Sequence, residues 1–140
     1  MAATGTAPCD RWGEDGPFIR EILGRISAKW TVLIIGTLAT GPLRYSELLA
    51  RIPGISQRML TVTVKELQRD GIVTRTAYPE VPPRVEYELT PLGASLLSIV
   101  LGMAEWAAEH QDEIRANRAR FPAKALADAD VGADREPVRR

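Results

Sequence analysis

Residues 46–90 carry two helix patterns, a tight break and two alternating stretches, in an order that few folds accommodate. "SELLARI" (46–52) and "SQRMLTVTVKELQRD" (56–70) are both typical of helices, and Pro53–Gly54 separates them. "IVTRTAY" (72–78) and "RVEYELT" (84–90) alternate like two half-buried strands. The "PEVPP" between them is too rich in proline to pair with a strand, and it predicts the tip of a hairpin.

Further helices are predicted on both sides of this block. "PFIREILGRI" (17–26) has apolar residues at helical spacing. "SAKWTVLIIGTLATG" (27–41) is apolar nearly all round and predicts a central buried helix capped by Ser27. Ser46 is expected to cap the short helix and Ser56 the helix after it, and Thr90–Pro91 to begin a long last one. The order predicts a mainly α (α+β) fold, a winged helix-turn-helix with a two-stranded β-hairpin wing.

The last predicted helix carries an apolar seam that steps by four and three residues. Its members are Leu92, Leu96, Ile99, Met103, Trp106 and His110. This spacing is coiled-coil-like, and the helix is longer than a small domain needs to cover its own core. We therefore expect a partner, most simply a second copy of the chain, with the first and last helices as flanking dimerisation helices.

Composition narrows the function. One cysteine, Cys9, excludes an internal disulfide, and with one histidine it argues against a Cys/His zinc site. No phosphate-binding loop or nucleophile elbow occurs, so we expect no catalytic residues, no metal and no cofactor. No uninterrupted apolar run reaches the roughly 18 residues of a membrane span, and the start does not look like a signal peptide. A cytoplasmic protein without a membrane partner is expected.

The organisation expected is one domain with loose ends. Residues 1–16 read as an irregular, flexible arm that carries the lone Cys9. Residues 17–120 hold the winged helix and the dimerisation helices. Residues 121–140 lack periodicity and are predicted to be a disordered tail.

Two long segments resemble the HxlR-type regulators, a branch of the winged-helix transcription factors near the MarR group. They are "KWTVLIIGTLATGPLRYSELLARIPGISQRMLTVTVKELQRDGIVTR" and "YPEVPPRVEYELTPLG". The lone N-terminal cysteine and the tryptophan on the last helix also match this family. The resemblance implies a homodimer that binds double-stranded DNA and represses or activates nearby genes. It makes residues 56–69 the helix that enters the major groove and residues 79–84 the wing tip. One departure is Val62, where relatives often carry glutamine or another polar residue. A valine there could contact a thymine methyl group or simply loosen base readout.

Taken alone, a charged helix face is usually just exposed to solvent. Given the family resemblance, we expect the outward face of the 56–69 helix to contact DNA. Arg58 in the first turn can grip guanine with two hydrogen bonds, and Gln57 can pair with adenine. Thr61 and Lys65 are better placed for phosphates, Ser56 for a phosphate at the helix N-terminus, and Val62 for a thymine methyl group. Arg84 either contacts the minor groove or a phosphate of DNA or forms a cross-strand pair with a neighbouring glutamate, and Arg75 has the same two readings.

The dimer interface is expected to include Ile19, Ile22, Leu96, Ile99, Met103 and Trp106. Relatives that use a cysteine in the arm to sense oxidants make Cys9 a candidate redox switch, and a structural role stays open beside it. With no second cysteine, it could bond only to its symmetry mate or a small thiol, or take an adduct. A small-molecule effector in the dimer seam is also open.

The expected function is repression by a dimer on a pseudo-palindromic operator. The rival is a winged helix that binds protein instead of DNA, which should expose apolar residues on the outward face. Val62 is the one such residue that the sequence suggests.

Overall fold

The structure, a computed structural model, describes the backbone of residues 8–133 and the side chains of residues 11–129. The chain divides into two compact units, Met1–Leu101 and Gly102–Arg140. Cys9 lies on the described backbone, but its side chain is outside the described residues.

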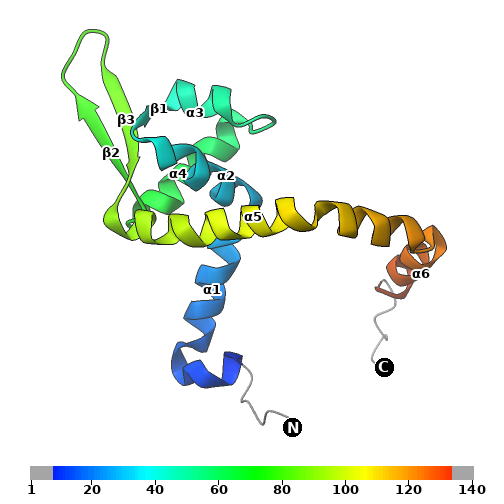
Figure 1. Cartoon of the computed structure of the whole chain (residues 1–140). Helices are drawn as coiled ribbons and strands as arrows, with labels where there is room; N and C mark the ends of the chain where they lie inside the picture. The colour runs from blue at the N-terminus through cyan, green and yellow to red at the C-terminus, as the bar shows by residue number, and fades with distance from the viewer. Residues whose placement is uncertain (1–7, 134–140) are drawn as a thin grey trace, which may run out of the picture. The chain divides into compact units, whose positions relative to one another are not determined.

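The first unit is a winged helix-turn-helix, as predicted (Figure 1). Its elements in chain order are η1 Pro8–Asp15, α1 Gly16–Ile26, α2 Lys29–Thr37, η2 Leu38–Thr40, β1 Leu43–Arg44, α3 Tyr45–Arg51, α4 Gln57–Arg69, β2 Val73–Tyr78, β3 Arg84–Leu89 and the first part of α5 Pro91–Arg120. The rest of α5 and α6 Ala123–Ala133 belong to the second unit.

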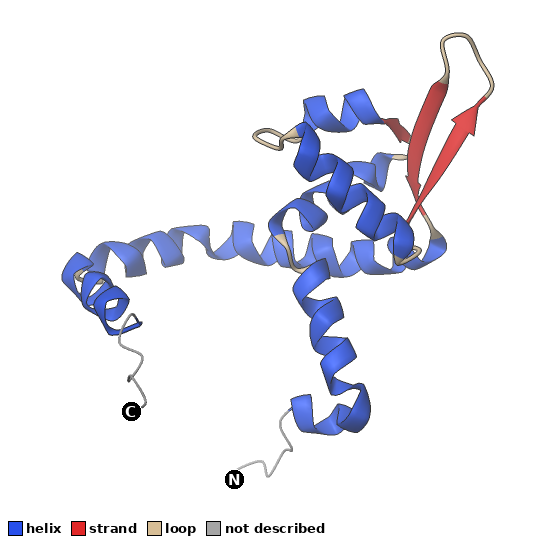
Figure 2. Ribbon diagram, turned by 180° about the vertical axis from the view of Figure 1, so that it is seen from behind, coloured by secondary structure: helices blue, strands red, loops and turns tan. Residues whose placement is uncertain are grey.

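The sheet has three antiparallel strands in the order β1-β3-β2 (Figure 2). β2 and β3 pair along their whole length, from Val73 opposite Leu89 to Tyr78 opposite Arg84. The predicted hairpin is therefore confirmed. The sequence missed β1, a two-residue strand in which Arg44 pairs with Glu86, because so short a segment shows no periodicity of its own.

The core forms around α2, as its continuous apolar pattern predicted. Ile34, Ile35 and Leu38 are at most 2% exposed. They pack with buried side chains of α3, α4 and β2, of which the largest fully buried are Leu48, Leu60, Leu67 and Val73. Full burial of each such side chain contributes about 1.5–3 kcal/mol, which makes this cluster the main source of stability.

Two predicted helix caps hold and two do not. The Ser56 hydroxyl accepts from the Met59 amide at 3.0 Å, and the Thr90 hydroxyl accepts from the Gly93 amide at 3.1 Å. Ser27 instead ends α1, where its hydroxyl donates to the Leu23 carbonyl, and α2 begins after Ala28. Ser46 lies inside α3, whose N-cap is Arg44, because β1 pairing fixes the backbone just before Tyr45.

Both ends of the described part of the chain are more regular than the sequence suggested. Residues 8–15, expected to be irregular, form the 3-10 helix η1. Residues 123–133 form α6, although its sequence lacks a helical period. α6 carries five alanines and its described side chains are all exposed, so high intrinsic helix propensity accounts for it better than packing does. The proposed domain boundaries stay predictions.

The first part of α5 packs on the core through Val100, which is buried, and Leu96 and Leu97, which are half-buried. An 18-residue window of α5 has a mean hydropathy of 1.4, so this helix could cross a membrane by length and composition, and so could the bent pair Arg11–Ile26 and Lys29–Thr40. The sequence reading counted only uninterrupted apolar runs. The core helix of a folded protein satisfies the same test, and α2 is such a helix, whereas only 11% of the α5 window is buried.

Helix α5 lies very close to the backbone just before β2 at Gly93. A Cβ atom added there would lie 2.2 Å from the Ile72 carbonyl oxygen, and that oxygen already accepts from the Thr90 amide. The helix can lie this close only because residue 93 has no side chain.

Gly93→Ala should therefore lower the free energy of unfolding by about 1–3 kcal/mol, because backbone must move to admit the methyl group. Gly36→Ala in α2 is the matched control: its Cβ meets nothing within 4 Å, and alanine favours helix, so stability should hold or rise. Urea denaturation followed by circular dichroism measures both. Equal stability of the two variants would contradict the assigned approach.

Candidate nucleic-acid interface

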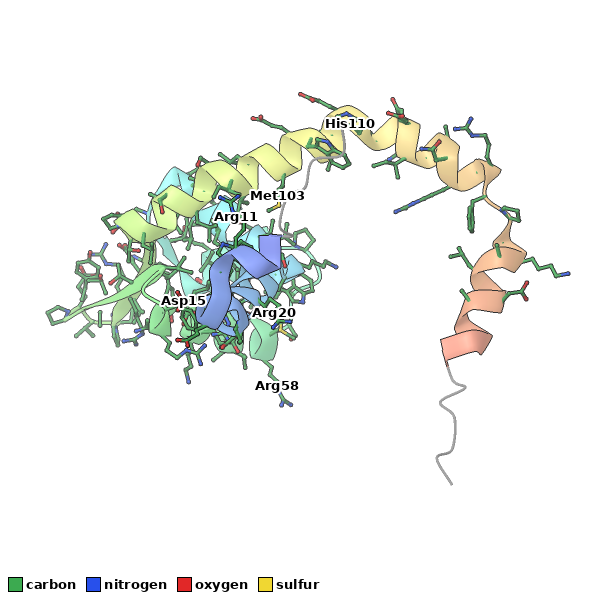
Figure 3. All side chains as sticks on the ribbon, turned by 90° about the horizontal axis from the view of Figure 1, so that it is seen from below. Arg11, Asp15, Arg20, Arg58, Met103 and His110 are labelled. Atoms are coloured by element: carbon green, nitrogen blue, oxygen red, sulfur yellow. The ribbon has the colours of Figure 1, made fainter. Side chains whose placement is uncertain are left out.

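Helix α4 has one buried and one exposed face, as its spacing predicted. Leu60, Val64 and Leu67 point into the core. The exposed face carries Gln57, Arg58, Thr61, Val62 and Lys65. Figure 3 shows Arg58 extending from the helix into solvent. The structure thus brings six predicted contact residues together, if the capping Ser56 is included, on one accessible surface.

The first turns of α4 are tied to α3 by Tyr45. Its hydroxyl lies 2.9 Å from the Gln57 carbonyl oxygen and 2.9 Å from the Thr61 hydroxyl. A carbonyl can only accept, so the tyrosine donates to Gln57 and receives the proton of Thr61. Thr61 therefore helps to fix the angle between the two helices, a role that its position on α4 did not reveal. The role of Tyr45 could not be predicted from the sequence, because its hydrogen-bond partners lie 12 and 16 residues away along the chain.

The C-terminal end of α4 is fixed by charge. The Asp70 carboxylate lies 3.2 Å from the Arg25 guanidinium of α1 and 3.3 Å from that of Arg69. Arg25 also lies 3.5 Å from Glu21. Arg69 and Arg25 are thereby compensated. Arg58 and Lys65, in contrast, form no ion pair with any side chain among residues 11–129.

Val62 is not the only apolar side chain on the outward face. Val62 is 46% and Met59 is 41% exposed. Both line an open cavity of about 310 Å³, whose other walls include Trp30 of α2 and Glu66. The surface next to the basic residues is therefore partly apolar, on the side of α4 that faces α2.

The wing arginine is paired with acids. Arg84 lies 2.9 Å from Glu80 at the tip and 3.0 Å from Glu86 on its own strand, and its guanidinium carbon lies 4.0 Å from the centre of the Tyr78 ring. Of the two readings of Arg84, the structure shows the glutamate pair, although neither glutamate is on the opposite strand. Arg75 is exposed and has no ion pair within the described part of the chain.

The predicted dimer residues fall on two surfaces, each described within its own unit. In the first unit, an apolar groove of about 240 Å³ lies between α1 and α5, and its lining includes Ile22, Leu96 and Ile99. Ile19 is half-buried on α1. In the second unit, Met103 and Trp106 are exposed, and the Trp106 ring stacks on His110 at 4.7 Å between centroids.

Comparisons with known proteins agree with this architecture. The family model described as HxlR-like helix-turn-helix matches residues 25–115. An HTH-type transcriptional regulator of Methanothermobacter thermautotrophicus is 48% identical over 88 residues, which are 63% of this chain and 67% of the relative. The solved structure of the regulator ytfH from Salmonella typhimurium has a TM-score of 0.69 at 38% identity, over 73% of this chain and 91% of that one.

The redox regulator HypR, solved in its reduced form, has a TM-score of 0.65 at 40% identity, over 70% of this chain and 97% of that one. With the family model covering most of the described fold, from the end of α1 well into α5, the resemblance inferred from the motifs is confirmed. The chain belongs to the HxlR-like helix-turn-helix family of transcriptional regulators.

Proposed function

We propose that the protein represses transcription by binding a pseudo-palindromic operator as a homodimer, in the cytoplasm and without a membrane partner. The observation that carries the proposal is the exposed face of α4, where Arg58 and Lys65 lack a charged partner among the described side chains. Leaving two cations uncompensated on a helix that is otherwise fixed at both ends is expected of a surface whose counter-charge comes from a ligand. Duplex DNA supplies that charge at every phosphate.

Each residue of the face has a proposed role. Arg58 and Gln57 contact base edges in the major groove, and Val62 contacts a thymine methyl group. Lys65 and Ser56 contact phosphates, the latter at the N-terminus of α4. Thr61 acts mainly through Tyr45, with which it shares a hydrogen bond. Arg84 would have to leave Glu80 to enter the minor groove of DNA. We therefore propose that it lies beside the sugar–phosphate backbone of the duplex instead.

Two substitutions on α4 should have different effects. Arg58→Ala should weaken operator binding by roughly 1–3 kcal/mol and relax sequence preference, because a bidentate base contact is lost. Lys65→Ala should weaken binding to all duplexes alike and make the slope of log K against log salt shallower by about one, because one phosphate contact is lost. Fluorescence anisotropy on specific and scrambled duplexes at several salt concentrations measures both.

Arg20→Gln on α1 provides a charge control outside this face and should leave the specificity ratio unchanged. The assignment of the α4 face would be wrong if Arg58→Ala kept the affinity and footprint of the parent protein.

The homodimer is supported by exposed apolar surface. Ile99 is 58% exposed beside the groove between α1 and α5, and in the second unit Met103 and Trp106 continue the same stepping pattern. Two domains on a two-fold axis contact half-sites about one helical turn apart, which adds the affinity that one small basic face lacks. A small-molecule effector would act by changing the spacing of the two α4 helices.

Ile99→Asp should convert the dimer to monomer, because a carboxylate would be buried without a partner in the interface. Leu101→Asp is the matched control, since Leu101 is also exposed on α5 (43%) but lies on the other side of that helix from the seam. Sedimentation velocity should show a monomer for the first variant and a dimer for the second. A monomeric parent protein would refute the dimer.

A redox role for Cys9 is proposed from the similarity to the redox regulator HypR. The Cys9 thiols of two protomers would form a disulfide, while a diazene oxidant takes up the two electrons and two protons. Oxidation should then abolish DNA binding by the parent protein and leave Cys9→Ser unaffected. Binding by the two proteins that is equally insensitive to oxidant would exclude Cys9 as the switch.

A protein-binding winged helix is the second candidate, and the exposure of Met59 beside Val62 is the observation that favours it. Its signature would be weak binding to every duplex, with no difference between Arg58→Ala and Lys65→Ala.

A further inference from the structure

A cleft with two arginines in its lining opens where the chain turns from β1 into α3. β1 pairs with β3 only through Leu43 and Arg44, and the next residue, Tyr45, is already helical (Figure 1). Arg84 and Val85 at the start of β3 therefore have a paired strand on the β2 side alone. On their other side, where β1 does not extend, lies a cleft of about 330 Å³. Its lining comprises Arg44, Tyr45, Ser46, Pro83, Arg84 and Val85.

The lining has the chemistry of an anion site. Two arginines and two hydroxyl-bearing side chains line the cleft, and no carboxylate does. Arg44 is exposed and forms no ion pair with residues 11–129, although it is in register with Glu86. The Glu86 carboxylate is already 3.0 Å from Arg84. Arg44 is therefore the group in this cleft whose charge is uncompensated by the described side chains.

Arg84 contributes a second, fixed group. Glu80, Glu86 and the Tyr78 ring hold its guanidinium in place. Its Nε atom is buried and has no hydrogen-bond partner among the described atoms. An unmatched buried donor is costly, so the contacts with Glu80, Glu86 and the Tyr78 ring must hold the guanidinium at this wall of the cleft against that cost.

The cleft lies between the two elements proposed to enter the grooves of DNA. On one side, Tyr45 bonds the first turns of α4. On the other, Pro83 and Arg84 connect the wing tip to β3. In a duplex, one sugar–phosphate strand separates the major groove from the neighbouring minor groove. A protein with a helix in one and a hairpin at the other must therefore meet that strand at the surface between them.

We propose that this cleft binds one backbone phosphate of duplex DNA, with Arg44 as the charged contact and Ser46 as a hydroxyl donor. The proposal rests on the proposed function, because it assumes that α4 enters the major groove. The phosphate carries no sequence information, so the contact sets the register of α4 on the duplex and adds affinity to every sequence equally. Arg84 is a positioning residue that holds the wing side of the cleft.

The test uses operator duplexes in which single phosphates are replaced, one at a time, by neutral methylphosphonates. For the parent protein, one position outside those that Lys65 senses should cost roughly tenfold in affinity, the usual scale of a charge-assisted contact. Arg44→Gln should bind the unmodified duplex roughly tenfold more weakly than the parent protein. The methylphosphonate at that position should lower the affinity of Arg44→Gln little further, and the slope of log K against log salt should be shallower by about one. Arg44→Lys should recover most of the affinity, and Arg20→Gln should behave like the parent protein.

Failure of this proposal is distinguishable from failure of the proposed function. If Arg44→Gln lost the same factor as the parent protein at every methylphosphonate, the cleft would not bind the backbone, while a loss of specificity in Arg58→Ala would still support the DNA-binding face. If the parent protein bound no duplex, both proposals would fail. A titration of the protein with inorganic phosphate at constant ionic strength, followed by the NMR resonance of the Arg44 Nε–H, tests whether the cleft binds a free anion. If this resonance shifted saturably while Arg44→Gln changed the effect of no methylphosphonate, the cleft would bind a free anion, and the assignment to DNA would be wrong.

Discussion

The position of α4 on the buried face of α2 is the constraint on which the rest of the structure depends. Ile34, Ile35 and Leu38 lie under Leu60, Val64 and Leu67, and all six are at most 2% exposed. Truncating Leu60 or Leu67 to alanine would cost roughly 2–5 kcal/mol, so α4 cannot rotate about its axis without losing much of the stability of so small a domain. Burial of Leu60, Val64 and Leu67 therefore determines which residues of α4 are exposed. The basic face is exposed because the core fixes the rotation of the helix.

Polar contacts then fix what the core leaves open. Tyr45 holds the beginning of α4 through two hydrogen bonds, and Asp70 holds its end through Arg25. Each contact alone is worth about 1 kcal/mol, far less than the core. Their importance lies in geometry, because a contact to a base edge tolerates little error in the position of the helix. A net charge of zero is no obstacle to this function, because charge is unevenly placed. Glu80 and Glu86 of the wing pair with Arg84, whereas Arg44, Arg58 and Lys65 have no acidic partner in the described structure.

The helices, the hairpin and the two working caps could be predicted because they depend on local patterns. Alternation marked β2 and β3, and Ser56 and Thr90 precede their helices in the ordinary way. What could not be predicted depends on partners distant in sequence. β1 exists only because β3 offers an edge, Tyr45 is defined by residues on α4, and Ser27 ends one helix instead of beginning the next. The face of α4 was therefore visible in the sequence, and the cleft beside it was not.

The most direct test of sequence-specific binding is selection from a randomised duplex library by the full-length protein at physiological salt, under reducing conditions. We expect enrichment of a pseudo-palindrome whose half-site centres lie about one helical turn apart. Arg58→Ala should lose the preference at one base pair in each half-site and keep the spacing. Recovery of the library without an enriched motif would contradict sequence-specific binding and leave a winged helix whose surface binds another partner.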